Sequence, residues 1–238
     1  MKVAVYSGSF NPLHIGHLAI IRHMIEEAGF DMVYLIVSPK NPLKDGISAA
    51  TGQDRYNAAV EAVKRHFPFR EVSEAECGDD MPPPAGGSRA ICKCSCGPLQ
   101  RAETVGKSGV IGASTSETRP VGKVMVDDIE LNMPEPHYTV RTLKALKDRE
   151  PENTFTFVMG ADNLADIHRW REYQTILKDF GVAVFPRTGH DLPQIKQDLL
   201  NEDPAYKIQV VDAPLVDISS TQIREAIANG DDPSLYLM

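Results

Sequence analysis

The sequence lacks any long apolar run, and it has little positive charge for its length. No stretch of the 238 residues approaches the length needed to span a bilayer. Residues 1–6 lead directly into a short β-branched run and lack the apolar region of a signal peptide. These absences predict a cytoplasmic protein with no membrane partner. The formal net charge of −8 argues against a protein that coats nucleic acid, since such proteins carry basic patches.

Cysteine is scarce and confined to one segment, at Cys77, Cys92, Cys94 and Cys96. A disulfide framework would spread its cysteines along the chain, so this clustering does not predict one. Three of the thiols would share one side of an extended chain, as a metal site would require. Their spacing is nevertheless poor for structural zinc, which favours the interpretation as free thiols.

The segment 71–123 also lacks aromatic residues, and it is rich in glycine, proline and serine. Neither a helical nor a strand period continues through it for more than a few residues. Such a segment cannot bury much apolar surface. We therefore predict a single domain over residues 1–238, interrupted by a disordered or loosely ordered insertion at 71–123.

Outside that segment, short β-rich runs alternate with runs of helical period. The pattern predicts the following elements: strand 3–6, helix 17–28, strand 32–37, helix 53–66, helix 139–149, strand 155–159, helix 164–178, strand 182–185, helix 192–200, strand 208–211 and helix 220–228. Repeated βα units favour an α/β fold with a doubly wound, Rossmann-like parallel sheet. In such sheets ligands bind at the carboxyl ends of the strands.

The first strand is followed by a turn with features that suit a phosphate. Gly8 permits a tight backbone, and a helix begins soon after Pro12, so N–H groups and a helix N-terminus would face the end of the strand. His14 and His17 are three residues apart and would share one face of that helix. On these residues alone, a phosphate site, a metal pair and core histidines all remain open.

A second polar cluster lies near the end of the chain, where Ser219, Ser220 and Thr221 precede Arg224. These residues would supply hydroxyl and N–H groups at the start of a helix, together with one cation. The simpler interpretation is an ordinary helix N-cap, and the two roles are compatible.

The two clusters together resemble the signature motifs of the nucleotidylyltransferase superfamily. Residues 8–17 look like its HxGH motif, and residues 218–224 look like its ISSTxIR motif. The resemblance implies a Rossmann-like nucleotidylyltransferase fold in which His14, His17 and Arg224 are catalytic. The ATP-binding residues that it implies are Gly8, Ser9, Phe10, Asn11, His14, His17, Ser219, Ser220, Thr221 and Arg224.

The middle of the chain is similar to the nicotinate-nucleotide adenylyltransferase family. The matching motifs are PxYTxxTL at 136–143, GxDxL at 160–164, the tryptophan region at 168–170, and the runs 39–44 and 186–189. The resemblance implies that Trp170 stacks on the pyridine ring, that Tyr138 and Thr139 hold the nicotinate carboxylate, that Asp162 contacts ribose hydroxyls, and that Lys44 and Arg187 lie near phosphate. Arg171 departs from the family pattern, in which Tyr often follows the tryptophan.

Simpler roles exist for the same residues. Trp170 would then be a packing residue, Asp162 would cap the helix that follows it, and Lys40, Lys44 and Arg55 would be solvated surface charges.

A phosphate monoester is already an anionic nucleophile, so its attack on the α-phosphorus of ATP needs alignment and charge stabilisation rather than a base. We therefore expect transfer of AMP from ATP to nicotinate mononucleotide, with release of pyrophosphate. Mg²⁺ is expected as the cofactor on the ATP phosphates, and no metal site made of side chains is predicted. Alternatives are nicotinamide mononucleotide or phosphopantetheine as the acceptor, or a nucleotide-binding protein without turnover. A homo-oligomer is possible, and no nucleic-acid partner is expected.

Overall fold

The computed structural model describes residues 1–39, 50–67, 123–213 and 218–238, and these belong to one compact unit. The predicted insertion at 71–123, apart from Lys123, lies outside the described residues, as do Lys44 and the four cysteines. Among the described residues, no helix is both long and apolar enough to cross a membrane.

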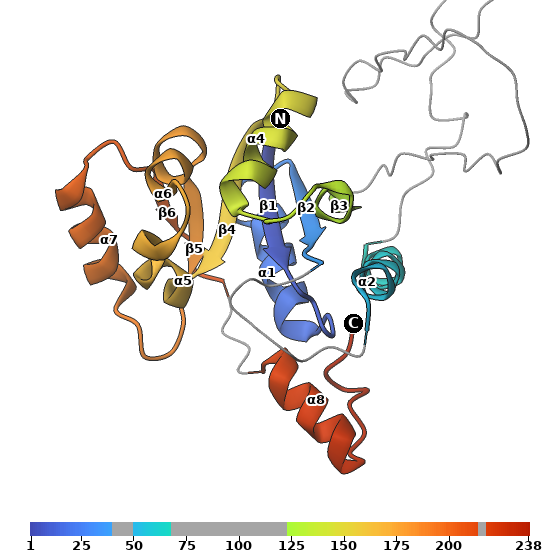
Figure 1. The fold of residues 1–238 in the computed structure, drawn as a ribbon. Coiled ribbons are helices and arrows are strands. Elements are labelled where there is room, and N and C mark those ends of the chain that lie inside the picture. The colour runs from blue at the N-terminus through green and yellow to red at the C-terminus, as the bar shows by residue number, and fades with distance from the viewer. Residues whose placement is uncertain (40–49, 68–122, 214–217) are drawn as a thin grey trace, which may run out of the picture. The chain divides into compact units, whose positions relative to one another are not determined.

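Six parallel strands form the sheet, in the order β3-β2-β1-β4-β5-β6 (Figure 1). The strands are β1 (Lys2–Gly8), β2 (Met32–Val37), β3 (Val124–Asp127), β4 (Thr154–Gly160), β5 (Val182–Phe185) and β6 (Ile208–Val210). This order and the all-parallel pairing confirm the doubly wound, Rossmann-like prediction. The sequence patterns missed β3, an edge strand that pairs only with β2 through four residues.

Ten helical segments join the strands in the described residues. They are α1 (Ile15–Glu26), α2 (Gly52–His66), α3 (Ile129–Asn132), α4 (Thr139–Arg149), α5 (Ala161–Ala165), η2 (Ile167–Arg169), α6 (Tyr173–Thr175), η3 (Ile176–Phe180), α7 (Leu192–Glu202) and α8 (Ser220–Asn229). The continuous helix predicted at 164–178 was wrong. The chain is extended at Trp170 and left-handed at Glu172, with φ of 51°, so it breaks into α5, η2, α6 and η3.

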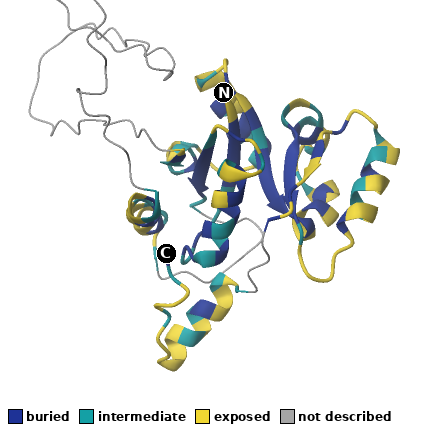
Figure 2. Cartoon of the chain, turned by 180° about the vertical axis from the view of Figure 1, so that it is seen from behind, coloured by how far each residue is buried: buried dark blue, intermediate teal, exposed yellow. Residues whose placement is uncertain are grey.

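Helices cover both faces of the sheet. One buried cluster joins α1 and α2 to one face of the strands, and a second joins α4, α5 and α7 to the other face. Figure 2 shows the strands almost wholly buried, while α7 and α8 present exposed residues to solvent. The sheet is therefore the middle layer, and its carboxyl edge lies between the two helical layers.

The strand order reverses between β1 and β4. From β1 the chain runs into α1 on one face, whereas from β4 it runs into α5 on the other face. The two connections diverge at this point, which leaves a crevice beyond the carboxyl ends of β1 and β4. The candidate site is built around this crevice.

Candidate active site

The turn after β1 is shaped by a buried aromatic side chain. Phe10 is 4% exposed, and its ring packs edge-on against Tyr6 and His17, with centroids 5.5 and 5.1 Å apart. Its backbone is left-handed, with φ of 43°. A Cβ on Gly8 would lie 3.1 Å from the Phe10 ring, so only glycine leaves room for this packing.

His14 and His17 lie side by side at the start of α1, with ring centroids 3.7 Å apart. Nδ1 of His14 accepts a hydrogen bond from the Gly16 N–H, and Nδ1 of His17 accepts one from the His14 N–H, both at 3.2 Å. A neutral imidazole has one N–H, so it must be at Nε2 in both rings. A Cβ on Gly16 would lie 3.1 Å from the His14 ring, which explains the glycine between the histidines.

Both histidines are neutral at physiological pH. Burial, with a smaller contribution from the positive Arg187, lowers the pKa of His14 to about 4. The pKa of His17 is also held well below its usual value, first by burial and then by His14 and Arg187. The pair therefore offers two Nε2–H donors rather than two cations.

The N–H groups in the first turn of α1 are already engaged within the protein. The Ile15 N–H donates to the Tyr236 carbonyl at 3.0 Å, the Gly16 N–H donates to His14, and the His17 N–H donates to the His14 carbonyl at 2.8 Å. The expectation that this helix terminus presents free N–H groups to phosphate is therefore not met. The donors that remain at this end of the helix are those of the two imidazole rings.

The late polar cluster meets the turn after β1, as the sequence predicted. Ser220 Oγ donates to the Pro12 carbonyl at 3.1 Å, and Arg224 Nη1 donates to the Asn11 carbonyl at 2.6 Å. Arg224 Nη2 also donates to Thr221 Oγ1 at 2.9 Å. Ser219 is the N-cap of α8, since its Oγ accepts from the backbone N–H three residues on at 3.2 Å. The N-cap interpretation therefore holds for Ser219, while Ser220 and Arg224 join the two motifs.

A small pocket opens between α1, β5 and the approach to α8. Its lining residues are Tyr6, His14, Gly16, His17, Ile20, Phe185, Pro186, Arg187, Ala213 and Ile218. The structure thus places both histidines and Arg187 around one space.

Asp162 and Arg187 also come together, although they follow different strands. Arg187 Nε lies 3.8 Å from Asp162 Oδ1, and its guanidinium carbon lies 5.0 Å from the centre of the Phe185 ring. Both side chains are nearly half exposed, so each remains accessible to a ligand. A Cβ on Gly160 would displace the Asp162 carboxylate and would lie 3.2 Å from Arg187, so a larger residue would disturb this pair. Asp162 does not cap α5, because no side chain caps that helix.

Trp170 has a packing role in this structure. The Trp170 ring packs edge-on against the Phe157 ring, with centroids 5.8 Å apart. It also packs against the buried cluster that joins α4, α5 and α7 to the sheet. Part of the indole remains exposed. Thr139 begins α4, and Tyr138 precedes it with 38% of its surface exposed. An ion pair of 2.7 Å between Lys144 of α4 and Glu172 draws the segment after Trp170 against α4.

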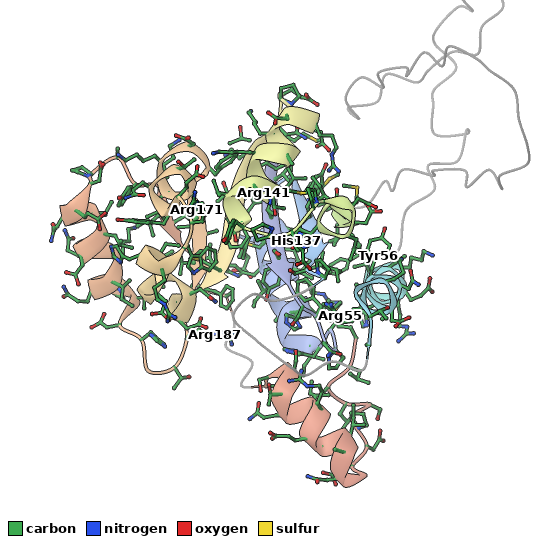
Figure 3. The ribbon with its side chains drawn as sticks, viewed as in Figure 1. Arg55, Tyr56, His137, Arg141, Arg171 and Arg187 are labelled. Carbon is green, nitrogen blue, oxygen red and sulfur yellow. The ribbon has the colours of Figure 1, made fainter. Side chains whose placement is uncertain are left out.

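For Arg55 the alternative of a solvated surface charge was left open, and the structure excludes it. Only 6% of Arg55 is exposed, and its guanidinium donates to backbone carbonyls at the carboxyl ends of β1 and β2 (Figure 3). The available signal was its helical phase. Arg55 lies four residues before Ala59 and therefore on the buried stripe of α2.

Comparisons with known proteins show the family to which the chain belongs. The cytidylyltransferase-like family model matches residues 5–226. The chain is 33% identical to a probable nicotinate-nucleotide adenylyltransferase of Flavobacterium psychrophilum, over 96% of this chain and 88% of that relative. It is 31% identical to the one of Flavobacterium johnsoniae, over 97% and 88%.

Among solved structures, the fold is similar to Plasmodium falciparum nicotinic acid mononucleotide adenylyltransferase complexed with NaAD. The TM-score is 0.63 at 16% identity, covering 99% of this chain and 90% of the other. At that identity the likeness concerns the fold.

Proposed function

The chain belongs to the nicotinate-nucleotide adenylyltransferase family within the cytidylyltransferase-like proteins, and on that premise we propose that it transfers AMP from MgATP to nicotinate mononucleotide. A phosphate oxygen of the mononucleotide forms a bond to the α-phosphorus of ATP. The bond from that phosphorus to the β-phosphate bridging oxygen breaks, and pyrophosphate leaves with the electron pair. The other product is nicotinate adenine dinucleotide.

The paired histidines carry this proposal. The acceptor phosphate is already deprotonated near neutral pH, since the second pKa of a phosphate monoester is about 6. No base is required, and neither imidazole needs to remove a proton. The reaction instead needs donors for the charge that moves onto the leaving group, and the Nε2–H groups of His14 and His17 are such donors.

Neutral donors suit this reaction better than a fixed pair of cations would. Two imidazolium rings 3.7 Å apart would repel each other in the empty site, and burial makes that repulsion stronger. Neutral rings keep their positions without a ligand, because each Nδ1 is held by a backbone N–H. The donors are therefore arranged before ATP binds.

We propose that Mg²⁺ enters with ATP, on the β- and γ-phosphates. Magnesium keeps several waters and is commonly bound by substrate phosphates with one or two carboxylates. In the part of the chain that the structure describes, no three His, Cys, Asp or Glu side chains are grouped to hold a metal. The imidazole Nδ1 atoms of the site are already engaged. A metal that enters on the substrate phosphates needs no such group of side chains.

The acceptor would occupy the side of the crevice next to β4 and β5. There Asp162 supplies a carboxylate for ribose hydroxyls and Arg187 supplies a cation for phosphate, and both remain accessible. The exposed part of Trp170 offers a face for the pyridinium ring. We assign carboxylate recognition to Tyr138 and Thr139 at the start of α4.

The test is pyrophosphate release from MgATP with four acceptor conditions: nicotinate mononucleotide, nicotinamide mononucleotide, phosphopantetheine and no acceptor. The highest kcat/KM is expected with nicotinate mononucleotide, and its dinucleotide product is identified by mass spectrometry. A preference for the amide would contradict the acid-form assignment. Release with none of the acceptors, while ATP still binds, would favour a nucleotide-binding protein without turnover.

A further inference from the structure

Arg55 forms an unusual contact set for a buried arginine. Its Nη1 donates to the carbonyls of Ser9 at 2.5 Å and Ser38 at 2.8 Å, and its Nη2 donates to the carbonyl of Pro39 at 2.8 Å. The three acceptors are all backbone groups, from the turn after β1 and the segment after β2. One side chain of α2 therefore ties two loops at the carboxyl edge of the sheet.

This guanidinium has no carboxylate partner among the described residues. Its neighbour Asp54 is engaged with Thr51, accepting from that residue's N–H at 2.9 Å and from its hydroxyl at 2.7 Å. Arg55 Nε is buried without a hydrogen-bond partner in the described structure. Burial also lowers the pKa of Arg55, yet an arginine stays charged at neutral pH. Burying a cation without a counter-ion lowers the stability of the fold through its desolvation penalty. An arginine that only tied two loops together would therefore do so at a loss of stability.

The contact with Ser9 fixes the orientation of one peptide group. The Ser9–Phe10 bond is trans, so its C=O and N–H point in opposite directions. In the sheet, β2 lies on one side of β1 and β4 lies on the other. Because Arg55 also binds Ser38, which follows β2, it draws the Ser9 carbonyl towards the β2 side. The Phe10 N–H is thereby directed towards the β4 side.

That side is where the candidate site lies. Arg187 follows β5, beyond β4, and shares a pocket with His14 and His17. In the view of Figure 3, Arg55 and Arg187 lie on different sides of α1. In the part of the chain that the structure describes, the Phe10 N–H has no hydrogen-bond acceptor of its own.

We propose that Arg55 is a positioning residue for phosphate binding, which acts by holding the Ser9–Phe10 peptide so that the Phe10 N–H donates to the triphosphate of ATP. The charge of Arg55 also lies behind the turn, where no carboxylate of the described residues pairs with it. This proposal rests on the proposed function in one respect, because it requires that the turn binds the phosphates of ATP. It does not depend on which mononucleotide is the acceptor.

The sequence offers a specific spectroscopic test. Ser9–Phe10 is the only Ser–Phe dipeptide in the chain. Labelling serine with ¹³C at the carbonyl and phenylalanine with ¹⁵N therefore gives a single peak in a carbonyl-to-amide correlation spectrum. That peak reports both the Ser9 carbonyl held by Arg55 and the Phe10 N–H. The probe is the Mg²⁺ complex of an ATP analogue with a methylene group between the α- and β-phosphorus atoms.

In the wild type, the analogue should move the Phe10 proton resonance downfield. In Arg55→Gln, the Ser9 carbonyl resonance should already differ before ligand is added, and the downfield shift should be smaller. An unmoved resonance in the wild type at saturating analogue, or an equal shift in the variant, would overturn the role of Arg55 and leave the proposed function standing. Failure of the analogue to bind the wild type, measured by calorimetry, would overturn both.

Kinetic measurements separate three roles of Arg55: orienting the Ser9–Phe10 peptide, supplying positive charge, and supporting the fold. Arg55→Gln should lower kcat/KM for ATP by roughly 10- to 100-fold, somewhat less than removal of a transition-state donor itself. Arg55→Lys keeps the charge but not the planar fork, so it should still lose about tenfold. Full activity in Arg55→Lys would overturn positioning in favour of charge alone.

Arg65→Gln is the matched control. Arg65 lies on the same helix, is exposed, and donates to one carbonyl, that of Met238, at 3.3 Å. The Arg65→Gln variant loses the same charge as Arg55→Gln, and its kcat/KM should stay within about twofold of the wild type, as expected for an exposed site. The calorimetric stoichiometry of analogue binding counts intact sites in each variant. If the activity of Arg55→Gln falls only in proportion to that stoichiometry, Arg55 is a structural anchor and the proposal is wrong.

Discussion

Acidification should destabilise the empty protein through His14. Burial lowers the pKa of this imidazole to about 4 from a usual value of 6.5. Below pH 6.5 the unfolded chain therefore binds a proton at this position that the native protein does not bind. The effect is absent above about pH 7 and grows as the pH falls towards about 4.

The magnitude follows from the difference between the two pKa values. Each pH unit below 6.5 and above the folded pKa costs about 1.4 kcal/mol of unfolding free energy. Between pH 7 and pH 5 the contribution of His14 is therefore a loss of about 2 kcal/mol. The pKa of His17 is also lowered, so its contribution has the same sign.

Urea unfolding at pH 7, 6 and 5 measures this loss in the wild type and in His14→Asn. Asparagine is a good N-cap and keeps an acceptor for the Gly16 N–H, so the start of α1 should persist. Acid-sensitive groups that do not interact with His14 are common to both proteins and cancel in the comparison. The part of the His17 shift that His14 causes is lost in the variant, and it adds to the difference with the same sign. The variant should lose about 2 kcal/mol less than the wild type between pH 7 and pH 5.

Equal losses in the two proteins would refute a buried, neutral His14. A His14 that was protonated and favourably paired in the empty site would give the opposite sign, because the wild type would then resist acid better than the variant. The three outcomes are well separated, since a difference of about 2 kcal/mol is a change of roughly 30-fold in the folding equilibrium.

Three further predictions concern the site and the insertion. His17→Ala should lower kcat by about 100-fold or more with little loss of stability. His23 is buried on the same helix, so His23→Ala should lower stability and spare kcat, and matching losses of both in His17→Ala would favour a core histidine. Trp170→Ala should raise the dissociation constant of the mononucleotide by roughly tenfold, measured by calorimetry, and unchanged affinity would exclude stacking. Deletion of residues 71–123 should leave pyrophosphate release largely intact, and a folded but inactive deletion variant would contradict this.

Local sequence patterns predicted most of the sheet. Strands such as β1 and β2 are β-branched runs that end at glycine or a polar residue, and the helices after them have a clear apolar stripe. The misses have physical causes. Strand β3 is too short to establish a period, and the helix predicted at 164–178 ends at a left-handed Glu172 that no local pattern signals. Tertiary contacts decide both positions.

The sequence motifs named three of the residues that line the pocket, but not the chemistry of the site. The motifs named His14, His17 and Arg187, and the structure places them around one pocket. They could not show that both rings are neutral, because that depends on burial and on a cation more than 160 positions away in the sequence. The helical phase of Arg55 signals its burial, but its carbonyl partner Ser9 lies 46 positions away and no local pattern names it.

The contacts between the two motifs also determine when the site forms during protein synthesis. Arg224 and Asn11 are 213 positions apart, and Ser220 and Pro12 are 208 apart. At about 5–20 residues per second, a ribosome needs roughly 10 to 40 s to make the later residues after the earlier ones. A nascent chain that has not reached α8 lacks these contacts between the two motifs. The early folding of the sheet therefore depends on its own core and not on the completed site.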